Sequence, residues 1–532
     1  MLKISELNFG FNDAENYRRK ENKQLLNQFF IRTESLDHII HGNSFFLMGE
    51  KGTGKTAYAV YVCNNNYGET VGTLSYIRET EFQKFISMKT DRHLGLSDYT
   101  NIWKVILCLI LSEKIHQRET NFISKAFPKF RNLKDAIDEF YANAFSPEII
   151  HSMQFVEESK TAAELLSKFA RAGGEEKIQV TFTESRFQTN LLYIQKKFED
   201  ALSSLKLNMN QILFIDGIDI RPLGIPYDDY LECIKGLANA VWSLNNDFFA
   251  GIKDSKGRLK VVLLIRPDIF NSLGLQNQNN KIRDNSVMLD WRTTYKEYRS
   301  SDLFKVADQL LSSQQGEALP EGAAWDHYFP FQISNFPDDE KSDPSFIDFL
   351  RKSYYRPRDI VSMLNFLQEH ALRRNKNLEN FDKSDLDSAD YRRDCSDYLL
   401  GEIKDALSFY YTNQNYELFL KFFEYLDGRK SFDYRDYEKA WAKFINFIQA
   451  NRTEPLPGFF ETQDTFLQFL YELNVISYIE DAAFEQFHRW CFRERSLGNF
   501  SPKVKTHERY SIHPGLTKAL NTGSSIFRRK KK

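Results

Sequence analysis

The chain has 532 residues, of which 42% are hydrophobic and 27% are charged, and its formal net charge is −2. This length exceeds what one hydrophobic core usually supports, so we expect two to four domains. The composition excludes a disordered or fibrous protein, and the balanced charge excludes a surface that is basic throughout, so contact with nucleic acid would need a local patch.

The N-terminal segment and the cysteines indicate in which cellular compartment the protein is expected. Acids interrupt the first sixteen residues, which lack the apolar core of a signal peptide, and the longest strongly apolar run, Val105–Leu111, is too short to cross a bilayer. The five cysteines lie far apart without a C-x-x-C pair, as expected for free thiols and not for a metal site. We therefore expect a soluble cytoplasmic protein without a membrane segment.

The strongest motif is "GEKGTGKT", Gly49–Thr56, which satisfies G-x-x-x-x-G-K-[ST]. An apolar run precedes it, as in a buried strand, and small apolar residues follow it, as in a helix packed on a sheet. Glycines let backbone N–H groups surround phosphates, and the helix directs its positive end at them. The motif predicts that ATP and Mg²⁺ are bound here, with GTP left open. The predicted nucleotide-binding residues are Gly49, Glu50, Lys51, Gly52, Thr53, Gly54, Lys55, Thr56 and Ala57.

Two residues of the loop have specific predicted roles. A second strand supplies a further predicted residue of the same site. We expect Lys55 to reach the β- and γ-phosphates and Thr56 to bind Mg²⁺ through its hydroxyl. The segment "QILFIDGIDI" predicts a buried parallel strand whose carboxyl end carries Asp216. Asp216 is therefore the second predicted Mg²⁺ residue.

A third strand is predicted in "RLKVVLLIRPDIF", at Val261–Ile265. Arg266 follows it, and Pro267 stops the ladder of hydrogen bonds, as is typical of a strand end. A fixed guanidinium at this position could report whether the γ-phosphate is present, because its charge-assisted bonds vanish on hydrolysis. The alternative is a solvated arginine at a strand end.

The order of phosphate loop, acid strand and arginine strand resembles the ASCE division of P-loop ATPases, and within it the AAA+ and STAND families with their origin-recognition and NACHT members. The resemblance covers roughly residues 10 to 400. NACHT acid strands read apolar run, D-G, apolar, D-E, which the chain matches through Asp219 and leaves at Ile220, where that family has glutamate. The resemblance implies that Asp219 orients or deprotonates the attacking water, and the missing glutamate implies slow hydrolysis.

A second sensor is implied further along the chain. The sequence Arg356-Pro357-Arg358 opens an amphipathic helical pattern that resembles the small helical lid of AAA+ and STAND proteins. In that lid an arginine near the start of a helix contacts phosphate, and the pattern does not choose between Arg356 and Arg358. The alternative is a helix start with two solvated arginines.

The chain between the loop and the acid strand is longer than a minimal core needs. Apolar residues at helical spacing predict a helical insertion at about residues 112–205, broken near Gly173 and Gly174. Binding of a protein partner or self-assembly into a homo-oligomer is the role we expect for this insertion.

The C-terminal part reads as helices followed by short alternating strands, including "ISYIE", "FHRWCFRE" and "RYSIHP". This pattern resembles a winged helix, a companion of origin-recognition and STAND ATPases. From Phe487 to His513 there are six Lys or Arg against two acids, and the last five residues are "RRKKK". Such a basic end suits contact with nucleic acid. Protein binding and a merely solvated tail are the alternatives.

The predicted architecture is an α/β P-loop NTPase core at 1–345, a helical lid at 346–404 and a winged-helix domain with a basic tail at 405–532. The predicted function is a slow ATPase that acts as a nucleotide-dependent conformational switch. The alternative is an initiator-like ATPase that binds DNA through its winged helix. By resemblance, ATPases of this layout belong to bacterial regulation or anti-phage defence.

Overall fold

The computed structural model describes residues 1–77, 96–122, 184–221, 225–275, 278–334, 342–411, 413–451, 456–481 and 486–523. Contacts divide the chain into two compact units. Unit 1 comprises Met1–Thr33, Glu50–Gly54 and Asp290–Lys532, and unit 2 comprises Glu34–Gly49 and Lys55–Leu289. The three domains drawn from the sequence stay a prediction.

Unit 2 is built on a five-stranded sheet in which every neighbouring pair of strands is parallel. The strand residues are mostly buried, because a parallel sheet is covered by helices on both faces. The expected α/β core with a parallel sheet flanked by helices is confirmed. In spatial order the strands are β2 (Thr70–Tyr76), β3 (Asn210–Asp216), β4 (Leu259–Ile265), β1 (Phe46–Met48) and β5 (Ser286–Met288).

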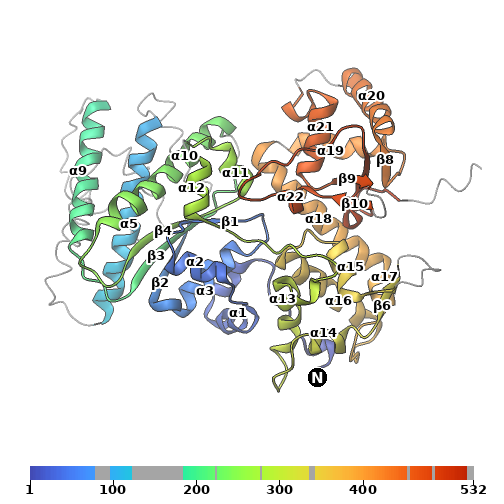
Figure 1. Cartoon of the computed structure of the whole chain (residues 1–532), viewed down its shortest axis with the longest axis horizontal. Coiled ribbons are helices and arrows are strands. Elements are labelled where there is room, and N and C mark those ends of the chain that lie inside the picture. Colours follow the sequence, from blue (N-terminus) through green and yellow to red (C-terminus); the bar gives the residue numbers. More distant parts are fainter. Residues whose placement is uncertain are drawn as a thin grey trace, which may run out of the picture. The chain divides into compact units, whose positions relative to one another are not determined.

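The helices of unit 2 lie on the two faces of this sheet. In Figure 1, α5 (Leu96–Phe122) and α10 (Tyr227–Ser243) lie to the left of and above the sheet, and α2 (Glu34–His41) and α3 (Lys55–Asn65) lie on its other side, below. The other α-helices among the described residues of this unit are α9 (Glu184–Ser203), α11 (Pro267–Ser272) and α12 (Gln278–Asn285).

The register of the sheet brings three strand ends together. Strand β4 pairs with β1 on one side and with β3 on the other. Because all three strands are parallel, their carboxyl ends lie at one edge of the sheet, where ligands bind in open α/β sheets. Gly49, Asp216 and Arg266 stand at or directly after these ends. The strands predicted around the loop, the acid and the arginine are confirmed.

The predicted helical insertion is described in part. Helix α5 packs against α9 and α10, and the Trp103 indole N–H donates to the Cys233 carbonyl at 3.1 Å. Gly236 permits close packing, since a Cβ there would lie 2.5 Å from the Cβ of Tyr99. Residues 123–183, which include the predicted break at Gly173 and Gly174, lie outside the described residues.

Unit 1 begins with short helices and continues into a helical region rich in packed aromatic rings. Trp325 stacks on Phe329 at 4.2 Å between ring centroids, and Phe346 meets Trp325 edge-on at 5.0 Å. The elements are η1 (Ile4–Glu6), η2 (Ala14–Arg18), η3 (Lys20–Asn22), α1 (Lys23–Phe29), η8 (Tyr298–Ser300), α13 (Asp302–Ser312), α14 (Ala323–Tyr328), β6 (Gln332–Ser334), β7 (Ser342–Pro344), α15 (Ser345–Arg351), α16 (Pro357–Arg374), α17 (Lys383–Asp387) and α18 (Ala389–Tyr410).

The amphipathic helix expected after Arg356 is confirmed as α16. Pro357 occupies its first turn, where the missing N–H of proline costs nothing. Ile360, Met363, Leu364 and Leu367 form its buried face.

The C-terminal part of unit 1 combines helices with a four-stranded antiparallel sheet. The order of the sheet is β10 (Gln486–Arg489), β9 (Ile476–Asp481), β11 (Arg509–Ile512) and β8 (Ser431–Asp433). Its helices are α19 (Asn413–Glu424), α20 (Tyr434–Asn451) and α21 (Gln463–Glu472), with short turns η9 (Gly458–Phe460) and η10 (Pro514–Leu516). The three predicted helices and the strands predicted after them are confirmed, whereas β8, which lies between α19 and α20, was not predicted.

One predicted strand is wrong in its second half. The segment read as a strand at 487–494 leaves the sheet after Arg489, and Cys491–Glu494 form the short helix α22. Trp490, Cys491 and Phe492 are buried in succession, which a strand with one solvated face cannot achieve.

The described residues also bear on the membrane and cysteine predictions. Within them, no helix combines the length and the apolar character that crossing a bilayer requires. All five cysteines are free thiols, and four of them are buried.

His513 joins the C-terminal part to the region before α16. It is only 2% exposed, its Nδ1 accepts a hydrogen bond from the Gly515 N–H at 3.2 Å, and its ring lies 4.7 Å from that of Tyr354 and 4.9 Å from that of Trp490. Burial lowers the pKa of His513 to about 3, although a hydrogen bond to the backbone of Ser353 opposes the shift. His513 is therefore neutral in the folded chain.

We expect His513 to make unit 1 sensitive to acid. Below the ordinary pKa of 6.5 the unfolded chain gains a proton that the folded chain does not, so stability is lost as the pH falls from 6.5 toward 3. The loss is about 1.4 kcal/mol per pH unit. Urea unfolding followed by tryptophan fluorescence between pH 7 and 5 measures it. His513→Gln should flatten this dependence, whereas the matched change at exposed His507 should not; an equal slope in both variants would contradict the assignment.

Candidate functional site

In unit 2, the ends of the glycine-rich loop are held at the edge of the parallel sheet. The Gly49 N–H donates to the Ile265 carbonyl at 3.3 Å, which continues the β1 and β4 pairing by one residue. Lys55 is the first residue of α3, is 8% exposed, and its ammonium donates to the Gly49 carbonyl at 2.8 Å. The positive charge of Lys55, which is mostly buried, thus lies at the N-terminus of a helix. Both the charge and the helix dipole favour the binding of an anion there.

Thr56 and Asp216 meet beside Lys55. The Thr56 hydroxyl donates to Oδ2 of Asp216 at 2.6 Å, and the Gly217 N–H donates to Oδ1 at 2.8 Å. A hydroxyl and a carboxylate side by side are the oxygen ligands that Mg²⁺ takes in sites that also use substrate phosphates. The structure therefore brings together the two residues predicted to bind the metal.

The carboxyl group of Asp216 has unusual electrostatics. Its burial and then the negative charge of Asp219 raise the pKa of Asp216 to about 6, although the bond from Thr56 and the charge of Lys55 act in the other direction. A cation at this carboxylate would relieve the cost of its charge. These residues fit a divalent cation.

The turn after β3 places Asp219 and Ile220. The Tyr230 hydroxyl donates to the carbonyls of Ile218 at 2.6 Å and Ile220 at 3.2 Å, which fixes the turn. Asp219 is half-buried and lies close enough to raise the pKa of Asp216. Ile220, at the position where the similar family has glutamate, is 65% exposed. No sequence signal pointed to Tyr230.

Gly217 is required in this turn. Its φ is +87°, and a Cβ would lie 2.8 Å from the Ile77 carbonyl oxygen. A glutamate directly after Asp216, as in many motor ATPases, would therefore be strained on this backbone.

Arg266 is held by a residue that the sequence analysis did not single out. It is 5% exposed, so the alternative of a solvated arginine is wrong. Its Nε donates to Asp268 at 3.0 Å, and a second guanidinium nitrogen bonds the same carboxylate. A phosphate that binds Arg266 must therefore either share the guanidinium with Asp268 or replace the Asp268 carboxylate as its partner.

In unit 1, both predicted lid arginines contact the middle of the loop. The Arg356 guanidinium donates to the Lys51 carbonyl at 2.7 Å, and the Arg358 backbone N–H donates to the Gly52 carbonyl at 3.3 Å. Gly52 has φ +87°, and a Cβ there would lie 3.2 Å from that of Arg358. Both arginines lie against the loop, and the choice between them as phosphate contacts stays open.

Arg356 is the centre of a buried charge cluster. It bonds Asp359 through Nε at 3.0 Å and through a terminal nitrogen at 2.6 Å, and Glu402 at 3.1 Å. The Tyr398 hydroxyl adds a bond to Asp359 at 2.9 Å. Burial opposes the charge of Glu402, but Arg356 and the neighbouring lysine of the loop hold its pKa below its usual range. The alternative of a solvated arginine is wrong for Arg356.

Two further contacts of unit 1 hold the loop and were not anticipated. The Trp291 indole N–H donates to the Thr53 carbonyl at 2.9 Å. The Glu50 carboxylate forms an ion pair with Arg495, which is 7% exposed and lies just after α22. Trp291 and Arg495 lie 238 and 445 residues from their partners along the chain, so no local signal could reveal them.

The basic face predicted in the C-terminal part is partly neutralised, because three of its six basic residues pair with two acids of the same part. Arg489 bonds Glu480 at 2.7 Å, Lys505 pairs with the same carboxylate, and Arg509 bonds Asp481 at 2.7 Å. The count from Phe487 onward missed these two acids, which antiparallel pairing of β9 brings beside the basic residues. The expected nucleic-acid contact therefore gains no support from the described residues, and the "RRKKK" tail lies outside them.

Comparison of the chain with protein-family models and with curated proteins found no match.

Proposed function

We propose that the chain is a slow ATPase whose loop at Gly49–Thr56 is a P-loop for the phosphates of ATP. One observation carries the proposal: the bonded pair of Thr56 and Asp216, beside the mostly buried ammonium of Lys55, at the carboxyl edge of a parallel sheet. The hydroxyl and the carboxylate are suitable ligands for Mg²⁺, and the ammonium is suited to bind the phosphates of a nucleotide.

Each residue has a distinct part in the proposed reaction. The Lys55 ammonium exchanges its hydrogen bond to the Gly49 carbonyl for hydrogen bonds to the β- and γ-phosphate oxygens. Thr56 and Asp216 hold Mg²⁺, which when bound neutralises charge on the phosphates. Asp219 orients the attacking water and accepts its proton as the γ-phosphoryl group passes to the water oxygen and ADP leaves. Ile220 supplies no second carboxylate, which favours slow turnover.

The loop also supports a conformational switch. Its middle, Glu50–Gly54, belongs to unit 1, whereas Gly49 and Lys55 belong to unit 2. Arg356, Arg358 and Trp291 bond three successive carbonyls of this middle segment. Phosphates that draw the loop N–H groups inward would alter these three bonds, so Arg356, Arg358 and Trp291 would be held differently beside an occupied and an empty loop. We propose that the C-terminal helices and sheet are a winged helix that responds to this change.

The test of this function is direct. Titration calorimetry with ATP in the presence and absence of Mg²⁺ measures binding, and release of phosphate measures hydrolysis. We expect Mg²⁺-dependent binding and slow turnover. A chain that binds no nucleotide under either condition would refute the proposal.

Replacing Asp219 separates hydrolysis from binding. Asp219→Asn should slow phosphate release about 100-fold, since a positioned base contributes 10²–10⁴ in rate, while the affinity for ATP stays within about twofold. Single-turnover phosphate release and calorimetry check the two effects. The exposed Asp228→Asn is the matched control in the same unit. Unchanged turnover in Asp219→Asn would mean that another residue positions the water.

A further inference from the structure

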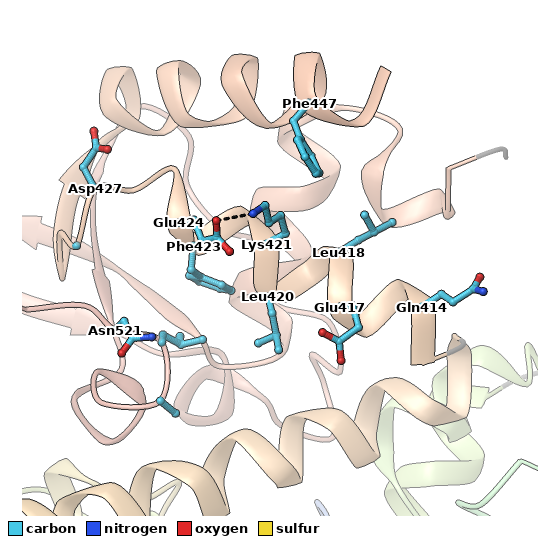
Figure 2. A pocket seen from close by; sticks show the side chains of 13 residues that line it. Gln414, Glu417, Leu418, Leu420, Lys421, Phe423, Glu424, Asp427, Phe447 and Asn521 are labelled. Atoms are coloured by element: carbon cyan, nitrogen blue, oxygen red, sulfur yellow. Dashed lines mark hydrogen bonds and ion pairs between the residues drawn. The ribbon is translucent and has the colours of Figure 1, made fainter. Parts of the chain in front are cut away.

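A groove runs along the exposed side of α19 in the C-terminal part of unit 1. It has a volume of about 1060 Å³. Phe447 of α20 borders it on one side and Ala519, Leu520 and Asn521 border it on another, as Figure 2 shows for Phe447 and Asn521. Leu418, Leu420 and Phe423 supply apolar side chains from α19 itself. We name this hollow the α19 groove.

The charged residues that line the α19 groove are mostly acidic. Glu417, Glu424 and Asp427 stand against a single lysine, Lys421, so three acids and one base leave a net charge of −2. Lys421 bonds Glu424 at 2.6 Å, and its ammonium lies 5.2 Å from the centre of the Phe447 ring. Glu417 and Asp427 are exposed, and among the described residues Asp427 lies 3.9 Å from the ammonium of Lys443. An apolar groove with acidic ends fits a short segment that is apolar and basic.

The chain itself carries such a segment next to the groove. Gly523 is bonded through its N–H to the carbonyl of Gly428, a residue that lines the groove, at 2.7 Å. The sequence continues from there as "SSIFRRKKK", residues 524–532. Nine residues can reach about 30 Å when extended, whereas a twelve-residue helix such as α19 is about 18 Å long. The segment is therefore long enough to follow the whole groove.

We propose that the α19 groove is the docking surface for the chain's own basic tail, residues 524–532. Ile526 and Phe527 supply apolar side chains for the groove, and Arg528–Lys532 supply the positive charge that Glu417 and Asp427 attract. Because the tail begins at the rim of the groove, its effective concentration there is in the millimolar range, so weak contacts suffice for occupancy. The basic tail is then neutralised within the chain.

The proposal is tested by competition between the tail and a probe. The probe is a fluorescent peptide of sequence SSIFRRKKK, and binding is read by anisotropy at low salt. A chain ending at Gly523 should bind the peptide, and the intact chain should bind it at least tenfold more weakly, because its own tail occupies the groove. Glu417→Lys with Asp427→Lys in the shortened chain should lower the affinity about tenfold or more.

Matched controls identify the surface and the occupant. Glu438→Lys with Glu461→Lys changes two exposed acids of the same part that do not line the groove, and it should leave peptide binding within twofold. A peptide with alanine at Ile526 and Phe527 should bind more weakly although its charge is unchanged. Equal peptide binding by the intact and shortened chains would overturn the proposal, as would equal binding by the two charge-reversal variants. Competition that appears only when the intact chain dimerises, by measured mass, would assign the groove to a second copy and overturn docking within one chain.

Discussion

Lys55→Ala should lower the affinity of the chain for ATP with Mg²⁺ at least 100-fold. The side chain carries a positive charge, is 8% exposed and stands at the start of α3, where its ammonium donates to the Gly49 carbonyl at 2.8 Å. Hydrogen bonds to charged groups contribute about 1.5–3 kcal/mol each, and two phosphate groups lie within reach in the proposed complex. Calorimetry with ATP at fixed Mg²⁺ measures the loss directly.

A control separates this loss from a general effect of charge or folding. Lys206→Ala removes a lysine of unit 2 whose side chain is 55% exposed, and it should leave ATP affinity within twofold. Because Lys55 also bonds the Gly49 carbonyl, thermal unfolding of Lys55→Ala must show a folded protein before the titration is interpreted. A folded Lys55→Ala variant with unchanged ATP affinity would remove the nucleotide hypothesis.

The parts of the fold and site that could be predicted from sequence are those with a local physical cause. Continuous apolar runs predicted β1, β3 and β4, since a parallel strand is buried on both faces. The order of parallel strands then brings their carboxyl ends to one edge of the sheet, and this places Asp216 near Thr56 although 160 residues separate them.

The parts that could not be predicted depend on partners distant in the chain. The sequence indicated a role for Arg266 and for either Arg356 or Arg358. It did not indicate that Asp268 holds Arg266 or that Glu402 holds Arg356. Which acid pairs with which arginine depends on side-chain packing and burial, and a local sequence pattern predicts neither of them. The basic face of the C-terminal part stays a prediction that gains no support, because strand pairing places acids of β9 among its basic residues. The sequence shows which residues are charged, but whether a charge is exposed and unpaired depends on the tertiary structure.

Arg356→Ala should produce the largest loss of stability among single changes near the loop, about 3–5 kcal/mol. The change leaves Asp359, which is 1% exposed, and Glu402, whose side chain is 10% exposed, without their shared cation. Unpaired buried carboxylates cost far more than the pair itself contributes. Urea unfolding followed by tryptophan fluorescence measures the loss.

The matched control is Arg358→Ala, which changes an arginine two residues further along the chain, in the first turn of α16. The side chain of Arg358 is 25% exposed and its guanidinium lies 3.7 Å from Glu402, so its removal should cost about 1 kcal/mol or less. Arg356→Met combined with Asp359→Leu removes both charges of the closest pair and should recover part of the lost stability, because no uncompensated Asp359 remains. If Arg356→Ala cost no more than Arg358→Ala, the charge cluster would not be what holds the start of α16 to the Lys51 carbonyl. A large loss that the paired replacement partly restores would instead show that the charges, and not the packing of the arginine stem, create the dependence.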